Sequence, residues 1–161
     1  MKTLYLVRHA KSSWEEHLVD HERILNERGK KDSVLVANYA ASAFVKPSLM
    51  LSSTATRAYT TALEFKKAFG MDDKDFTPLP ELYDFSGNEV LKIIESTPDD
   101  ISSLMVFGHN YGLTQLVNKL GNKYIDNLPT TGLVQITFMT DTWKNLSNGK
   151  TTATVFPKDL R

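Results

Sequence analysis

The chain has 161 residues, 41% of them hydrophobic, and its 19 basic residues balance its 19 acidic ones. Such a length predicts one domain, residues 1–161, and the absence of cysteine excludes disulfides, thiolate metal sites and cysteine nucleophiles. The balanced charge argues against nucleic acid as a partner. The sequence shows neither a signal peptide nor a run of the ~20 apolar residues that a membrane span requires. We therefore expect a cytoplasmic protein that binds no membrane.

A strand that leads into a charged pair opens the chain. Residues 3–7 form an apolar run of the kind found in buried strands, and Arg8 and His9 follow where the strand gives way to a loop. A guanidinium beside an imidazole supplies a phosphate clamp and a nucleophile or proton carrier. Residues 10–26 carry many charges, and their apolar residues follow neither helical nor strand spacing, which indicates a functional loop.

The next elements alternate between helix and strand. Apolar residues repeat at helical spacing over residues 27–44, and residues 48–51 form a second short strand. The hydroxyl residues 52–54 are N-cap candidates for a helix that runs to Phe69. The chain therefore starts with a β-α-β-α order.

Further elements follow a polar, proline-bearing connection, residues 71–87. A short amphipathic helix over residues 88–96 precedes a buried strand over residues 103–107. His109 stands just after that strand, and the next helix covers residues 112–120. This region therefore continues the alternation of helices and strands.

Two strands close the chain, over residues 132–138 and 151–156, and their connection contains Asn148-Gly149, a hairpin turn signal. Alternating strands and helices predict a mostly parallel sheet covered by helices, to which the last two strands add an antiparallel hairpin. The predicted fold class is α/β, a three-layer α/β/α sandwich.

Three strand exits carry residues that can bind phosphate. Arg8 and His9 follow the first strand, Arg57 lies in the first turn of the helix after the second strand, and His109 follows a later strand. If these strands are parallel neighbours, all three exits lie on one edge of the sheet, where helix N-termini add positive charge. Two arginines and two histidines then face one point, which is an arrangement suited to a dianion.

The ordered set of motifs resembles that of the histidine phosphatase (phosphoglycerate mutase-like) superfamily. Arg8-His9-Ala10 resembles its Arg-His-Gly signature, residues 52–58 its second-arginine motif, and residues 108–110 its second-histidine motif. The small SixA-type phosphohistidine phosphatases are similar in particular, over residues 8–14, Asp20, Arg23, residues 25–29 and residues 156–160. The resemblance implies a phosphoglycerate mutase-like fold.

The resemblance also implies a role for each residue of the clamp. His9 would be the nucleophile that carries the phosphoryl group, with its other ring nitrogen donating to a backbone carbonyl. Arg8, Arg57 and His109 would bind the phosphoryl oxygens. No cofactor or metal is implied. Further substrate-binding candidates are Ser12 and Asn110.

The sequence departs from the family pattern beside the nucleophile. Ala10 replaces the usual glycine, and Glu15 replaces an asparagine that binds phosphate in mutase-like members. A carboxylate cannot donate to phosphate, so Glu15 should point away and mutase activity is not expected.

No general acid stands out in the sequence. The candidates are Asp84, Glu81 and Asp20, with Glu22 near Asp20 in the same loop, and the favoured interpretation of each is a solvated charge or a partner for Arg23. A protonated phosphohistidine expels imidazole, so a weak or missing acid is tolerable when a P–N bond is broken.

These inferences predict a phosphatase that acts through a phosphohistidine intermediate on His9. The favoured substrate is phosphohistidine on a protein such as a phosphotransfer domain, and inorganic phosphate is the product. A broad-specificity phosphomonoesterase of small phosphate esters and a non-catalytic phosphate-binding module remain as alternatives.

We expect Trp14 to pack over the mouth of the site. His17 and His21 have the spacing of helical metal ligands, but no apolar stripe supports a helix there, so no metal site is expected.

Overall fold

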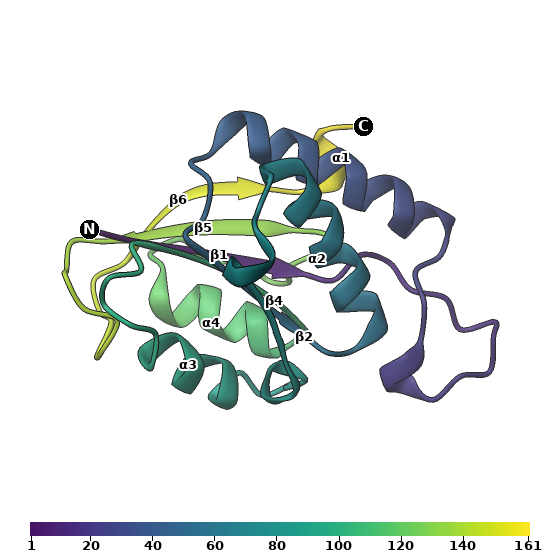
Figure 1. Cartoon of the computed structure of the whole chain (residues 1–161), viewed down its shortest axis with the longest axis horizontal. Coiled ribbons are helices and arrows are strands. Elements are labelled where there is room, and N and C mark those ends of the chain that lie inside the picture. Colours follow the sequence, from purple (N-terminus) through teal and green to yellow (C-terminus); the bar gives the residue numbers. More distant parts are fainter.

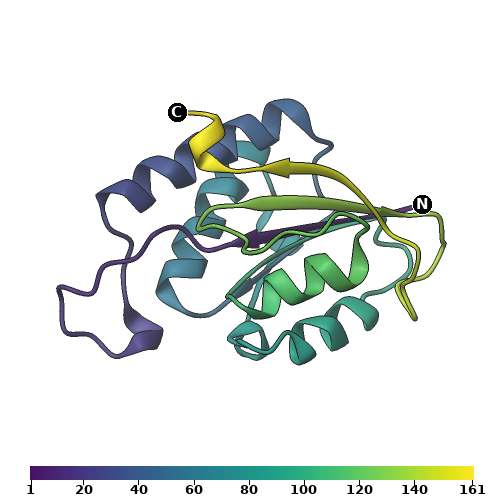
Figure 2. The same ribbon diagram turned by 180° about the vertical axis from the view of Figure 1, so that it is seen from behind.

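Six strands form one sheet with helices on both faces (Figure 1, Figure 2). The computed structural model describes residues 1–161. The strands are β1 (Lys2–Arg8), β2 (Leu49–Ser53), β3 (Phe76–Leu79), β4 (Ser103–Gly108), β5 (Leu133–Phe138) and β6 (Lys150–Val155). The helices are α1 (Glu27–Ala43), α2 (Thr56–Phe69), α3 (Asn88–Glu95) and α4 (Gly112–Leu120), with 3-10 turns η1 (Asp20–Glu22), η2 (Asp73–Asp75), η3 (Pro80–Leu82) and η4 (Pro157–Asp159). None of the helices combines the length and the apolar character that a membrane span requires.

The sheet has the order β3-β2-β4-β1-β5-β6. The pairs β3-β2, β2-β4 and β4-β1 are parallel, whereas β5 runs antiparallel to both β1 and β6. All six residues of the central strand β4 are buried, as expected for a strand covered on both faces. The predicted mostly parallel sheet with a C-terminal antiparallel pair is confirmed.

The helices form two layers on opposite faces of the sheet. α3 and α4 lie below the sheet in Figure 1, where Ile94 of α3 packs in one core with Val106 of β4. α1 and α2 cover the other face, where Phe65 of α2 packs in a second core with Phe107. Because Val106 and Phe107 are consecutive, their side chains point to opposite faces of the strand. The predicted three-layer α/β/α sandwich is confirmed.

Three neighbouring strands end at one edge of the sheet. Arg8 at the end of β1 pairs with Gly108 at the end of β4, and β2 ends beside β4 at Ser53. The segments that follow these strands therefore start side by side, as is usual for the carboxyl edge of a parallel sheet. The expectation that the three strand exits share one edge is confirmed.

Residues 10–26 extend from this edge as a long loop, drawn in purple at the right of Figure 1. The loop contains only η1 and an isolated bridge between Ser12 and Leu25. It leads into α1, where the Asn26 side chain accepts a hydrogen bond from the Gly29 amide at 2.8 Å. A Cβ on Gly29 would overlap the carbonyl oxygen of Lys11, so glycine is needed for this close approach of helix and loop.

The strand β3 is not predicted from the sequence, because it lies inside the polar connection over residues 71–87. It pairs in parallel with β2, with Pro78 opposite Ser52. β3 is at the edge of the sheet, where a proline without an N–H group is tolerated. A short edge strand with a proline lacks the apolar run that reveals the other strands.

The predicted hairpin of β5 and β6 is confirmed, and Asn148-Gly149 lies in its connection, which is a long segment over residues 139–149. Trp143 in this connection is fully buried, and its Nε1 donates to the carbonyl oxygen of Ile101 at 2.8 Å. A Cβ on Gly149 would overlap the Leu120 carbonyl oxygen. The glycine therefore permits close packing of the connection against the end of α4.

Candidate active site

A cleft of about 340 Å³ opens where the strands β1, β2 and β4 end. All four residues of the predicted clamp line it, together with residues of the 10–26 loop. Of its charged side chains four are cationic and one is anionic, so the cleft favours an anion. The lining residues are Arg8, His9, Lys11, Ser12, Trp14, Asp20, Arg23, Arg57, Phe85, His109, Asn110 and Thr130.

His9 is a neutral imidazole with one free ring nitrogen. Its side chain is buried, and Nδ1 donates to the carbonyl oxygen of Ala10 at 2.7 Å, which is the predicted tautomer-fixing bond. Burial lowers the pKa of His9 to about 3 despite this hydrogen bond, and the charges of Arg57 and Arg8 lower it further. Nε2 therefore keeps its lone pair at neutral pH, as a nucleophile requires.

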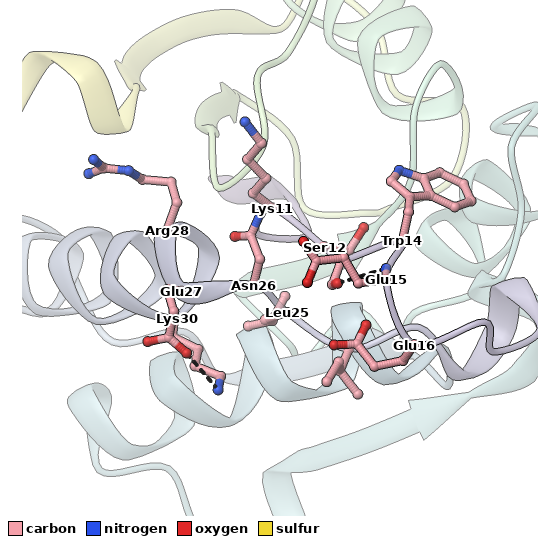
Figure 3. Close-up of a pocket in the computed structure, with 12 residues that line it drawn as sticks. Lys11, Ser12, Trp14, Glu15, Glu16, Leu25, Asn26, Glu27, Arg28 and Lys30 are labelled. Carbon is pink, nitrogen blue, oxygen red and sulfur yellow. Dashed lines mark hydrogen bonds and ion pairs between the residues drawn. The ribbon is translucent and has the colours of Figure 1, made fainter.

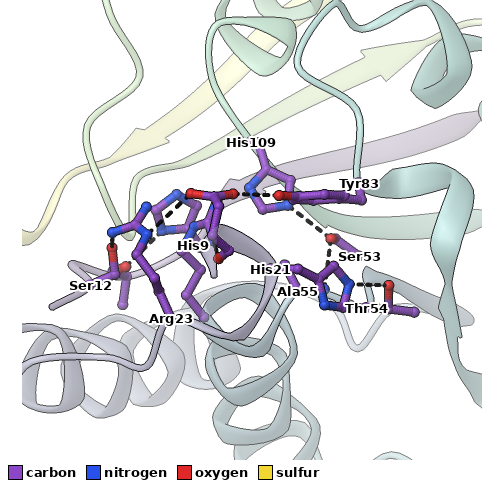
Figure 4. Close-up of polar contacts among 12 residues, drawn as sticks. His9, Ser12, His21, Arg23, Ser53, Thr54, Ala55, Tyr83 and His109 are labelled. Atoms are coloured by element: carbon purple, nitrogen blue, oxygen red, sulfur yellow. Dashed lines mark hydrogen bonds and ion pairs between the residues drawn. The ribbon is translucent and has the colours of Figure 1, made fainter. Parts of the chain in front are cut away.

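His109 lies beside His9, with the two ring centroids 5.3 Å apart. Its Nε2 is 2.8 Å from the hydroxyl oxygen of Ser53 (Figure 4). Burial lowers the pKa of His109 to about 3, and repulsion from His9 adds to the shift.

The expected N-cap role of residues 52–54 is wrong, because Ala55 is the cap residue of α2 and the Ser53 hydroxyl is engaged with His109.

The two arginines reach the cleft from β1 and from the first turn of α2. Arg57 is only 2% exposed, and its Nη1 and Nη2 donate to the backbone oxygen and the carboxylate of Asp20 at 2.6 and 3.0 Å. Arg8 is anchored by a hydrogen bond from Nη1 to the carbonyl oxygen of Leu128 at 3.0 Å. Both guanidinium groups are therefore held in place before any ligand arrives.

Unpaired polar atoms concentrate at this cleft. Four buried side-chain polar atoms of the chain have no hydrogen-bond partner, and three of them are Nε of Arg8, Nε of Arg57 and Nδ1 of His109. A buried polar group without a partner costs roughly 1–3 kcal/mol, so such atoms are few in folded proteins and often mark functional sites. Their location supports this cleft as the ligand site.

Asp20 does not fit the role of a general acid. Burial alone would raise the pKa of Asp20, but hydrogen bonds from Tyr83 and from Arg57 bring it down to about 2. Its carboxylate also accepts from Nε of Arg23 at 3.1 Å. Asp20 is therefore ionised in the cleft and has no proton to give at neutral pH.

The other two acid candidates are also corrected, because neither Glu81 nor Asp84 lines the cleft. Glu81 is exposed in η3. The Asp84 carboxylate accepts from the backbone amides of Ser86, Glu89 and Val90 at 3.0, 3.0 and 3.2 Å. Asp84 thus caps the start of α3, and its hydrogen bonds outweigh burial and lower its pKa.

The two additional substrate-binding candidates line the cleft but are already engaged. The Ser12 hydroxyl accepts from Nη1 of Arg23 at 2.6 Å. The Asn110 amide nitrogen donates to Asn127 and Leu128, and its oxygen accepts from the backbone amide and the hydroxyl of Thr114. The Asn110 side chain therefore ties two loops together at the cleft, and its role as a substrate ligand stays a prediction.

Three residues of the site were missed by sequence reasoning. Arg23 lines the cleft and stacks on Trp14, with 3.4 Å between its guanidinium carbon and the ring centroid, and this contact holds Trp14 at the predicted mouth. Tyr83 donates to the Asp20 carboxylate, and Phe85 lines the cleft. Arg23 is among the residues that resemble the SixA-type phosphatases, but it was given no role in the site, whereas no local signal distinguishes the two aromatic residues.

A second hollow of about 620 Å³ adjoins the cleft and shares Lys11, Ser12 and Trp14 with it (Figure 3). Glu15 lines this neighbouring hollow and not the cleft, as expected for a carboxylate that should point away from phosphate.

The structure contains no group of three or more side chains placed to hold a metal ion. The Nε2 of His21 is instead 2.9 Å from the hydroxyl oxygen of Thr54 (Figure 4).

A family model covers the first two strand-exit motifs, at Arg8-His9 and Arg57. The model described as the histidine phosphatase superfamily (branch 1) matches residues 4–104. An uncharacterized chloroplastic protein of Arabidopsis thaliana is 34% identical over 134 residues, which is 77% of this chain. The chain spans 61% of the length of that relative.

Solved structures share the fold along almost the whole chain. A protein assigned as the phosphohistidine phosphatase SixA from Agrobacterium tumefaciens is 27% identical and has a TM-score of 0.83, over 97% of this chain and 98% of that one. The protein histidine phosphatase SixA in complex with tungstate has a TM-score of 0.82 at 21% identity, over 99% of both chains. The second likeness concerns the fold alone, because the sequence identity is low.

Proposed function

Because the chain belongs to the histidine phosphatase superfamily, we propose that it hydrolyses phosphohistidine carried by a protein, through a phosphohistidine intermediate on His9. The observation that carries the proposal is the state of His9. Its Nδ1 is held by Ala10, its pKa is lowered to about 3, and its Nε2 is free in a cleft with four cationic side chains. Attack on a phosphoryl dianion needs this combination of a neutral nitrogen and surrounding cations. The likeness to SixA-type phosphohistidine phosphatases supports the choice of substrate.

The proposed reaction has two displacement steps. Nε2 of His9 attacks phosphorus while the P–N bond to the substrate breaks, and the substrate imidazole leaves with the proton that it already carried. Water then attacks phospho-His9, a P–O bond forms as the P–N bond to His9 breaks, and the protons of the water pass to phosphate and solvent. Arg8 and Arg57 donate to the phosphoryl oxygens, and His109 completes the clamp as charge develops.

The acidic residues of the chain favour a P–N bond as the one that is broken. Asp20 is ionised in the cleft, and Glu81 and Asp84 lie outside it, so no carboxylic acid is placed to protonate a leaving group. An alkyl phosphate expels an alkoxide, which needs such a proton. A protonated phosphohistidine expels imidazole, whose conjugate acid has a pKa of about 6.5.

A comparison of substrates tests this proposal. We expect kcat/KM for a phosphohistidine protein to exceed that for unactivated alkyl phosphates by at least ~100-fold, since a positioned general acid contributes about that much. Equal values would overturn the choice of substrate. The absence of turnover on every phosphorylated substrate, together with the absence of a phosphoenzyme, would overturn the catalytic proposal as a whole.

A matched pair of variants tests the nucleophile. His9→Asn should abolish turnover and the alkali-stable phosphoenzyme, while inorganic phosphate still binds through Arg8 and Arg57. His17→Asn makes the same change at an exposed histidine of the 10–26 loop and should leave turnover intact. Full activity in His9→Asn would refute the assignment of His9.

A further inference from the structure

Two exposed aromatic residues line the cleft and a third directly follows one of its lining residues, and we call the three the aromatic rim. Trp14, Phe85 and Tyr111 are 73, 47 and 57% exposed. They come from the 10–26 loop, from the segment between η3 and α3, and from the residue before α4. Elsewhere in the chain only Tyr39 and Tyr124 are aromatic and similarly exposed. Exposed aromatic side chains are thus concentrated at this one opening.

The rim is continuous with the cleft. Trp14 and Phe85 line the cleft, and Tyr111 directly follows Asn110, which also lines it. Burial lowers the pKa of Arg8, and an electrostatic contribution from Tyr111 opposes that lowering. A partner whose phosphoryl group enters the cleft therefore meets Trp14 and Phe85 as well.

Two rim residues are held in place by the residues of the site. The Arg23 guanidinium stacks on Trp14, and the Phe85 ring packs on His109 and Tyr83, with 5.0 and 5.2 Å between ring centroids. Side chains that are already ordered lose little freedom when a partner binds. Aromatic residues in such positions are frequent hot spots of protein interfaces.

We propose that Trp14, Phe85 and Tyr111 form the docking surface for the folded protein that carries the phosphohistidine, an inference that rests on the proposed function. A small phosphate ester is held by the clamp alone and has no atoms to cover three aromatic rings from three chain segments. A folded protein that presents its phosphohistidine within an apolar patch covers the rim and the clamp together.

The charge at the mouth further defines the partner. Lys11 lines the cleft, is exposed, and has no carboxylate within ion-pair distance. A partner surface with a carboxylate beside its apolar patch complements this lysine. We therefore expect the phosphohistidine to lie among apolar residues with at least one acidic neighbour.

Alanine variants of the rim test the proposal by the ratio of two kcat/KM values. One value is measured with a phosphohistidine-bearing phosphotransfer protein and the other with free phosphohistidine. Each of Trp14→Ala, Phe85→Ala and Tyr111→Ala should lower the ratio of protein to free substrate about tenfold, mainly through a higher KM for the protein. The ratio corrects for any effect on the chemical step, which matters because Trp14 and Phe85 contact site residues.

A matched control and a second measurement complete the experiment. Tyr124→Ala changes an aromatic residue that is 75% exposed and lies just beyond the C-terminal end of α4, away from the cleft, and should leave both values unchanged. An unchanged ratio in all three rim variants overturns the docking surface. A wild-type dimer in sedimentation that the rim variants convert to monomer, with an unchanged ratio, assigns the rim to a second copy and also overturns it. Failure of the proposed function is separate, since wild-type protein would then not act on phosphohistidine at all.

Discussion

The buried, neutral state of His9 makes the stability of the protein depend on pH. In the folded protein His9 has a pKa of about 3, whereas an unperturbed imidazole has a pKa of 6.5. Between these values the unfolded chain binds more protons than the folded protein. Stability should therefore be fully present above pH 6.5 and should fall as the pH is lowered towards 3.

The size of this effect follows from the pKa difference. Each pH unit below the unfolded pKa costs about 1.4 kcal/mol for one such group, so lowering the pH from about 7 to 5 costs about 2 kcal/mol for His9. His9→Asn removes the titrating ring, and the Asn amide can still donate to the Ala10 carbonyl. Wild-type protein should therefore lose about 2 kcal/mol more than His9→Asn over this pH step.

Denaturant unfolding at both pH values measures the difference. The other titrating groups, including His109, are present in both proteins and largely cancel in the comparison. His17→Asn is the matched control, because His17 is exposed in the 10–26 loop, and it should follow wild type. Equal losses in wild type and His9→Asn would show that His9 is not held neutral and that its Nε2 does not keep a free lone pair.

Further substitutions test the clamp, the carboxylate in it and the loop that borders it. Arg57→Lys should lower kcat/KM by about 100-fold, because a lysine cannot reproduce the fork of a guanidinium; a loss below threefold would contradict the role of Arg57. Asp20→Asn should lower the inhibition constant of inorganic phosphate about fivefold, since it removes a negative charge worth about 1 kcal/mol at ~4 Å under water-like screening. An unchanged inhibition constant would mean that the Asp20 carboxylate does not repel bound phosphate. Gly29→Ala should reduce the free energy of unfolding by about 1–3 kcal/mol, because its Cβ would overlap the Lys11 carbonyl oxygen; unaltered denaturant curves would contradict this.

The sequence alone determined the order of most elements and the four residues of the clamp. Apolar runs mark β1 and β4, and a helical stripe marks α1, because these signals depend on neighbours along the chain. Arg8, His9, Arg57 and His109 could be grouped before the structure was known, since parallel strands bring their exits to one edge. Only β3, a short edge strand with a proline, lacked such a signal.

Only the tertiary structure decided which polar side chains remain free for a ligand. The residue types of Asp20, Asp84 and Asn110 are common in active sites. In the folded protein, however, Asp20 is paired with Arg57, Asp84 caps α3, and the Asn110 amide donates to residues 127 and 128. The aromatic rim likewise joins segments that are far apart in the sequence. A motif specifies the type of a side chain, whereas its protonation, partners and exposure depend on residues that only folding brings next to it.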